Sequence, residues 1–287
     1  MTAPAHLTYV YAVVRDTERV RTAVQGIRGV SGMAVSLLVS ERSAEPAEPR
    51  RHIAFIISRV AADEFDERTL KARFEDIQWL EGMARAHHEV VQTLAREDTV
   101  LPLRLATLYQ DDRHAREALA AQHDLFAERI ALLRDRSEWG VKLCIESPAS
   151  SDDPAPDGRG SAGALSPGKA YLQRRRAQHS AREDRYHNAQ EAAQRIDELV
   201  PRFRTHRVRH PAQRGALAGP EENVLNDAYL VPDELAEAFS TALAAVATDL
   251  EGVRVEVTGP WAPYSFAMPP PPPEPPGEDS AADGPAR

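Results

Sequence analysis

The order in which strand-like and helix-like segments follow one another constrains the fold of this chain more than any single motif. In the first 110 residues the spacing of apolar side chains switches between the two-residue period of strands and the longer period of helices. The elements predicted in chain order are a strand at 7–14, a helix at 17–25, strands at 33–39 and 53–60, a helix at 70–96 and a strand at 100–107. This β-α-β-β-α-β order is the split βαβ, or ferredoxin-like, arrangement.

The second half repeats this order of elements without repeating the sequence. Its elements are predicted as a strand at 139–146, a helix at 169–203, strands at 204–210 and 227–231, a helix at 232–250 and a strand at 253–258. A further helix, at 112–134, connects the two halves. We therefore predict an α+β fold of two ferredoxin-like domains joined by a helix, with a disordered proline-rich C-terminal tail.

Shifts in composition predict the domain limits. Segment 41–51 is charged and contains prolines, and is expected to form a loop. Segment 147–168 is rich in Ser, Pro, Gly and Asp, which predicts a flexible insert. The expected organisation is an N-terminal ferredoxin-like domain at 1–110, a connecting helix at 111–137, a C-terminal α+β domain at 138–268 and an acidic, disordered tail at 269–287.

The two predicted sheets differ in how many of their faces are apolar. In the second half, strands 139–146 and 253–258 alternate apolar with polar residues, so one face is buried and the other meets solvent or a partner. In the first half both faces of strand 7–14 are apolar. Because a ferredoxin-like sheet carries helices on one face, the connecting helix, the second domain or another protein must cover the other. The two expected faces are Tyr9, Tyr11 and Val13 against Val10, Ala12 and Val14.

Bulk properties exclude several classes of protein. The formal net charge of -9 argues against a general nucleic-acid binder. A single cysteine, Cys144, leaves neither an intramolecular disulfide nor a cysteine zinc cluster. We find no signal peptide at the start and no apolar run of the ~20 residues that span a bilayer. We therefore expect a soluble, intracellular protein that does not interact with membranes.

The motifs that could carry catalysis fail on inspection. Segment 163–170 resembles a phosphate-binding loop, but Ala170 stands where Ser or Thr would hold magnesium, and no strand precedes it. His87 and His88 lie on a helix without the second histidine of a zincin motif. No Gly-x-Ser-x-Gly sequence is present. Acidic residues at 63–67 are better explained as helix caps than as metal ligands. We expect no catalytic residue, no cofactor and no metal.

The arginine-rich stretch 174–214 has two interpretations. It is either the solvated face of a long helix or a docking surface for an acidic protein, and the scarcity of aromatic residues makes RNA the weakest option.

A segment near the end of the ordered chain is unusual for its density of aromatic residues and prolines. Residues 255–266 read VEVTGPWAPYSF, in which a strand-like alternation runs into Gly-Pro-Trp and then into Pro-Tyr-Ser-Phe. Such a sequence is too apolar for a solvated tail. It predicts a rigid docked segment that either closes its own domain or contacts a partner.

Six blocks of the sequence, in order, span the chain from near its start to Phe266. They are YVYAVV at 9–14, the region 79–87, VLPLRLAT at 100–107, EWGVK at 138–142, AYLV at 228–231 and VTGPWAPYSF at 257–266. Together these blocks resemble the GvpL/GvpF family of gas vesicle accessory proteins, and the two most particular are LPLRLAT and TGPWAPYSF. The insert and the tail lie outside the resemblance.

The resemblance implies a non-enzymatic accessory protein that acts in gas vesicle assembly, located at the gas vesicle or in the cytoplasm. Its implied partners are the hydrophobic shell protein and other gas vesicle accessory proteins, which it would assist as chaperone, nucleator or minor wall component. Alternatives left open are a ferredoxin-like regulatory or RNA-binding module, and an enzyme with an unrecognised site.

The candidate partner-binding surfaces are the apolar sheet of the first domain and the C-terminal aromatic segment. The residues are Trp261, Pro263, Tyr264, Phe266, Tyr9, Tyr11 and Arg104. For the aromatic residues of 261–266 the competing interpretation is intramolecular closure of the second domain. Arg104, a charge inside an apolar strand, is expected either to be paired or to point at the domain junction.

Overall fold

The structure is a computed structural model that describes residues 6–39, 52–146, 167–212 and 221–268. The predicted loop at 41–51, almost all of the insert at 147–168 and the tail at 269–287 lie outside the described residues.

The first half is a four-stranded antiparallel sheet in the order β2-β3-β1-β4. Helices α1 and α4 pack on one face of this sheet, and residues of α2 join them. The elements are β1 (His6–Arg15), α1 (Glu18–Val24), β2 (Ser36–Val39), β3 (Ile53–Ala61), α2 (Ala62–Phe65), α3 (Glu67–Arg73), α4 (Ile77–Ala95) and β4 (Val100–Tyr109).

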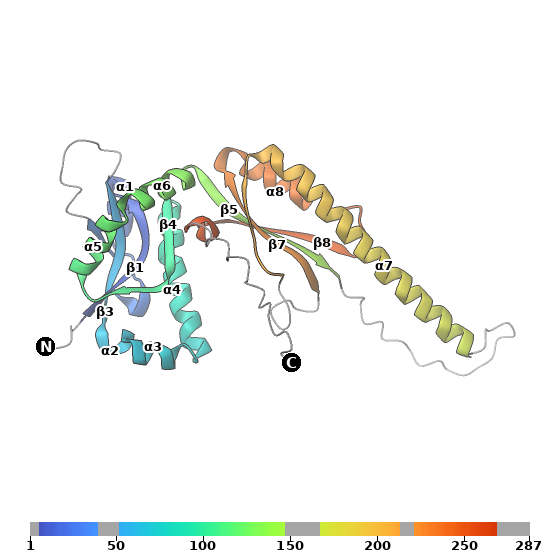
Figure 1. Ribbon diagram of the computed structural model, residues 1–287, viewed down its shortest axis with the longest axis horizontal. Coiled ribbons are helices and arrows are strands. Elements are labelled where there is room, and N and C mark those ends of the chain that lie inside the picture. The colour runs from blue at the N-terminus through green and yellow to red at the C-terminus, as the bar shows by residue number, and fades with distance from the viewer. Residues whose placement is uncertain (1–5, 40–51, 147–166, 213–220, 269–287) are drawn as a thin grey trace, which may run out of the picture.

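The second half repeats the arrangement with the strand order β6-β7-β5-β8, again antiparallel throughout. Helices α7 and α8 lie on the same face of this sheet, and the N-terminal part of α7 projects beyond it (Figure 1). The elements are β5 (Arg136–Ile145), α7 (Pro167–Leu199), β6 (His206–Arg209), β7 (Glu222–Pro232), α8 (Ala236–Ala244) and β8 (Val253–Trp261). The predicted α+β class is confirmed, with a four-stranded antiparallel sheet in each half.

Two predicted helices are in fact broken. The segment 70–96 divides into α3 and α4, because the Asp76 side chain starts a new helix by accepting hydrogen bonds from the backbone N–H groups of Gln78 (3.0 Å) and Trp79 (3.2 Å). The segment 112–134 divides at Gln122 into α5 (Asp112–Ala121) and α6 (His123–Leu133). The connection between the halves is therefore two helices rather than one.

A β-bulge at Tyr11 changes the faces predicted for β1. Val10 pairs with Ile57 and Ala12 with Ile56, so Tyr11 is an extra residue in the ladder. Ala12 and Val14 consequently lie on the same side as Tyr9 and Tyr11, and Val13 joins Val10 on the other side. The strict alternation predicted for this strand is wrong beyond Tyr11.

The second apolar face of the first sheet is covered within the chain. Val10, Phe55 and Leu101 on this face belong to one buried cluster with residues of α5 and α6, among them Leu119 and Phe126. The same cluster takes in Leu230 of β7, Phe266 and Ala267. The sequence left three candidates to cover this face: the connecting helix, the second domain or another protein. In the structure the connecting helices and the second half cover it together.

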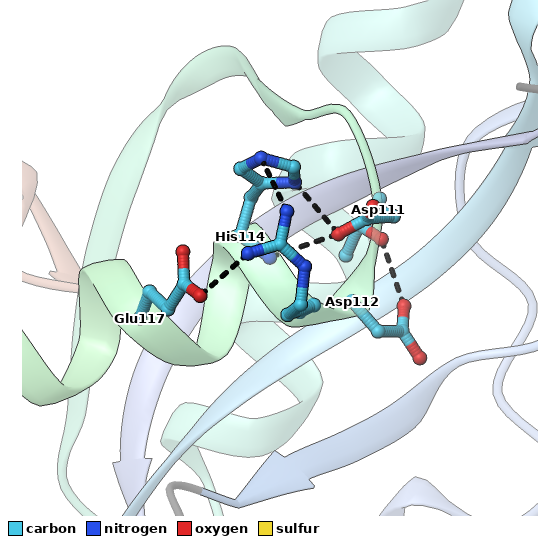
Figure 2. A network of polar contacts seen from close by, with 6 residues as sticks. Asp111, Asp112, His114 and Glu117 are labelled. Carbon is cyan, nitrogen blue, oxygen red and sulfur yellow. Dashed lines mark hydrogen bonds and ion pairs between the residues drawn. The ribbon is translucent and has the colours of Figure 1, made fainter.

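A polar network holds α5 on this face (Figure 2). Asp111 caps the helix by accepting from the backbone N–H of His114 at 2.9 Å. Asp112 accepts a 2.8 Å hydrogen bond from the Thr8 hydroxyl of β1 and forms an ion pair with Arg59 of β3. The start of α5 is thereby tied to the two central strands.

Candidate partner-binding site at the junction of the two halves

The end of β8 is held against the first half by one side chain of α4. The Gln92 amide donates to the backbone carbonyl of Pro260 (3.3 Å) and accepts from the backbone N–H of Ala262 (3.1 Å). Gly259 approaches β5 so closely that a Cβ at this position would lie 2.9 Å from the Glu138 carbonyl and from the Trp139 ring. At Gly-Pro-Trp the backbone therefore packs closely against β5 as it leaves the second sheet and enters the junction between the two halves.

A second anchor joins the aromatic segment to the second sheet. The Glu138 carboxylate accepts from the Ser265 backbone N–H at 2.8 Å and from the Ser265 hydroxyl at 2.7 Å, and His210 Nε2 lies 3.0 Å from that hydroxyl. Burial raises the pKa of Glu138 above the usual glutamate value, although the bonds from Ser265 act in the opposite direction.

Burial divides the aromatic segment into two groups. Pro263 and Phe266 are buried, and Phe266 packs in the cluster on the first sheet. Trp261 and Tyr264 remain 44% and 38% exposed. Phe266 thus packs within the chain, but at the junction between the halves and not in closure of the second domain alone. The side chains left available to a partner are Trp261 and Tyr264.

His88 of α4 lies between the two exposed rings. Its ring centroid is 6.0 Å from that of Trp261 and 6.0 Å from that of Tyr264, with the Tyr264 ring stacked. Because α4 is firmly packed on the first sheet, these contacts fix the orientation of both rings before any partner arrives. A pre-ordered aromatic pair loses little conformational entropy on binding.

Tyr9 and Tyr11 are core residues, and their assignment to a partner surface is corrected. Both are 0% exposed. The Tyr9 hydroxyl accepts from the Ala106 backbone N–H at 3.2 Å and pairs with His87 Nδ1 at 2.9 Å, and the Tyr11 hydroxyl bonds Ser58 Oγ at 3.0 Å. Burial raises the pKa of both hydroxyls and lowers that of His87 to about 4.

Arg104 sits on a bulge that interrupts β4. In the pairing with β1, Val10 faces Thr107 and Ala12 faces Pro102, so β4 holds extra residues between Pro102 and Thr107. The bond from Ala106 to Tyr9 and one from the Thr107 hydroxyl to the Arg104 carbonyl (2.7 Å) fix this bulge. Arg104 is exposed and has no ion pair among the described residues.

A cleft of about 350 Å³ runs between the halves beside Trp261. It is lined by the end of α4, the start of β5 and the end of β8, with Trp139 and Leu133 among the lining residues. Its charged lining residues are two arginines and two aspartates, Arg96, Arg136, Asp98 and Asp233. The cleft can receive an apolar side chain carried by a partner.

Sequence reasoning did not assign the residues that build this junction. Gln92 and His210 lie in no motif, His88 entered only in the test for a zincin motif, and Glu138 only as the first residue of the EWGVK block. These residues act together because the fold brings together parts of the chain that are far apart in sequence. No cluster of three or more potential metal ligands occurs within the described ranges. None of the helices in that part of the chain is long and apolar enough to cross a membrane.

Comparisons with known proteins agree on one family. The sequence model of the family described as "Gas vesicle synthesis protein GvpL/GvpF" matches residues 7–268. Gas vesicle protein L of Streptomyces sp. (strain CB03234) is 36% identical over 267 residues, which are 91% of this chain and 92% of that protein.

Two solved structures share the fold. GvpF from Anabaena sp. PCC7120 gives a TM-score of 0.59 at 18% identity, covering 92% of this chain and 97% of that one. GvpF from Microcystis aeruginosa gives 0.55 at 16% identity, covering 92% and 99%.

Proposed function

Because the chain belongs to the GvpL/GvpF family of gas vesicle synthesis proteins, we propose that it acts in gas vesicle formation as a non-enzymatic assembly factor. In this proposal it binds the hydrophobic shell protein, and other gas vesicle accessory proteins, as chaperone, nucleator or minor wall component. We further propose that it works in the cytoplasm and at the growing vesicle, and that its two halves are ferredoxin-like domains with the limits expected from the sequence.

One observation carries the proposed mode of action: an anchored segment presents two aromatic rings to solvent. Pro263 and Phe266 are buried, so the segment cannot retract, whereas Trp261 and Tyr264 stay exposed. Large aromatic side chains held in place are the residues that most often dominate binding energy at protein interfaces. Arg104, exposed on the β4 bulge, adds a positive charge on the surface of the first half.

The chemistry of a gas vesicle wall supports an apolar partner. A wall that keeps water out of its interior requires a subunit with apolar surface, and such a subunit aggregates unless something covers it. A fixed Trp–Tyr pair beside a cleft offers a small apolar contact that can be released when the subunit is incorporated. Binding would be transient, as a chaperone requires.

The test is co-expression with the major shell protein, followed by affinity capture of this chain. We expect the shell protein to be captured by the wild type and to be lost from the double variant Trp261→Ala/Tyr264→Ala. The matched control is Tyr171→Ala, which removes an aromatic side chain that is 59% exposed on α7, outside the junction. Thermal unfolding of each variant shows whether it remains folded.

Two results would refute this proposal. If the folded wild type captures no shell protein, direct binding is wrong. If the double variant and the control capture it equally, the aromatic pair is not the contact. The alternative of an RNA-binding sheet relied on Tyr9 and Tyr11, whose rings are buried and cannot stack on bases.

A further inference from the structure

One outer edge of the second sheet has no second partner strand among the described residues. In that part of the chain β8, at one end of the order β6-β7-β5-β8, pairs on one side only, with β5. At nine residues it is much longer than the other edge of that sheet, β6, or than β2 of the first sheet, each of four. β4, the remaining edge, is interrupted by the bulge at 103–106. β8 is therefore the long edge that can accept another strand.

The register with β5 shows which backbone groups of β8 are free. Glu146 donates to the Gly252 carbonyl at 3.0 Å, and Ile145 faces Val253. In an antiparallel ladder hydrogen-bonded pairs alternate, so Arg254, Glu256 and Thr258 bond to β5. Val253, Val255 and Val257 therefore direct their N–H and C=O groups towards the open edge.

The sequence around Val255 allows β8 to pair with β8 of a second copy of the chain. If a second β8 runs antiparallel with Val255 opposite Val255, then Arg254 of each copy faces Glu256 of the other. These are non-hydrogen-bonded pairs, in which opposing side chains approach most closely, with Cα atoms about 4.5 Å apart. The same register places Val253 opposite Val257.

Such a pairing would make favourable contacts on both faces of the sheet. On the helix-covered face, Val255 and Val257 are only partly buried at the rim of the core cluster, so the valines of a second copy would extend that cluster. On the open face, the side chains of Arg254 and Glu256 are 45% and 39% exposed. Arg254 has Glu221 at 2.6 Å and Glu256 of its own strand at 3.7 Å, so the Glu256 carboxylate of a second copy would be the third acidic group beside this guanidinium.

We propose that two copies of this chain associate through β8 in this register, joining the two second-half sheets into one antiparallel sheet of eight strands. The proposal does not use Trp261, Tyr264 or Arg104, and it stands or falls independently of binding to the shell protein. It leaves the junction surface of each copy available, so a dimer would carry two such surfaces.

The charges allow a decisive experiment by analytical ultracentrifugation over a range of protein concentrations. Arg254→Glu places two carboxylates opposite each other in both symmetry-related pairs, and Glu256→Arg places two arginines there. We expect each single variant to dimerise about tenfold or more weakly than the wild type. We expect an equimolar mixture of the two, and also the double variant Arg254→Glu/Glu256→Arg, to dimerise again.

A backbone variant tests the pairing without using charge. Val255→Pro removes only an N–H that points away from β5, so the ladder within the chain is kept, whereas two bonds of the proposed pairing are lost. A control for charge reversal is Arg85→Glu, which reverses an exposed charge on α4, where Arg85 pairs with Glu81 at i,i+4 and lies outside the proposed interface. Circular dichroism confirms the fold of every variant.

The outcomes separate the possible occupants of this edge. A wild type that stays monomeric at every concentration overturns the proposal. A dimer that Arg254→Glu, Glu256→Arg and Val255→Pro leave unchanged places the interface elsewhere and also overturns it. If the chain is monomeric but Val255→Pro abolishes capture of the shell protein, the edge binds a partner's strand instead of its own copy.

Discussion

Truncation of Phe266 should uncouple the two halves of the protein. The side chain is 7% exposed and packs with Leu230 of the second half against the far face of the first sheet. Transfer of a phenylalanine side chain to water costs about 1.5–3 kcal/mol, and the cavity left behind adds to this cost. We expect Phe266→Ala to lower the free energy of unfolding by about 3–4 kcal/mol, and the melting temperature by on the order of 10 °C.

The neighbouring Trp261 provides the comparison, because it belongs to the same segment but is 44% exposed. Trp261→Ala should cost about 2 kcal/mol or less, since roughly half of its contact area is already in water and no closed cavity forms. Both variants and the wild type would be compared by guanidinium unfolding followed by circular dichroism, with calorimetry to count transitions. For Phe266→Ala we also expect the single transition to separate into two.

The reasoning is refuted if Phe266→Ala and Trp261→Ala destabilise the protein equally, or if Phe266→Ala changes stability by less than about 0.5 kcal/mol. Either result would mean that the Phe266 side chain is not what couples the two halves.

Three smaller changes test individual contacts. Burial lowers the pKa of His87 from 6.5 in the unfolded chain to about 4 in the fold. The stabilisation that depends on neutral His87 is therefore complete above pH 6.5, and about 3 kcal/mol of the free energy of unfolding is lost as the pH falls towards 4. In urea titrations at a series of pH values, His87→Gln should lack this loss. Burial raises the pKa of Glu138, so its contribution to the free energy of unfolding is present below pH 4.5 and is lost as the pH rises through the pKa in the fold. Glu138→Gln should therefore gain stability relative to the wild type above pH 4.5. A stability difference between the two proteins that does not change with pH would contradict this. Thr8→Val removes the bond to Asp112 and should cost about 1 kcal/mol and speed amide hydrogen exchange in α5, with unchanged exchange showing that Arg59 suffices.

The sequence predicts the strands of this fold from two kinds of pattern. Apolar and polar residues alternate in β8, which belongs to a sheet with one exposed face, and apolar residues run almost continuously in β1, whose two faces are both covered. The prediction fails where a tertiary contact sets the geometry. The bulge at Tyr11 moves Val13 to the other face, and nothing in the local sequence marks it. The break at Gln122 is equally hidden, because the segment contains neither Gly nor Pro. The break before α4 had a visible signal, since Asp76 is a good N-cap residue.

The candidate site was predictable in part. Aromatic and proline density marks residues 261–266 as a docked segment, but density alone does not say which rings dock and which remain exposed. That division depends on Gln92 and Glu138, which lie more than a hundred residues away in the chain. The same limit applies to Tyr9 and Tyr11, which lie in a strand whose two faces are both covered.

The closure of the first sheet by Phe266 and Ala267 has a consequence for synthesis on the ribosome. The strands and helices of the first half emerge early, but two of the residues that finish its far face are among the last of the described chain to be made. A nascent chain that ends before them presents Phe55 and Leu101 under an incomplete cover. Completion of the first half is thus deferred until the second half has been synthesised, and a ribosome stalled shortly before Phe266 would display a first half with an apolar face that is incompletely covered.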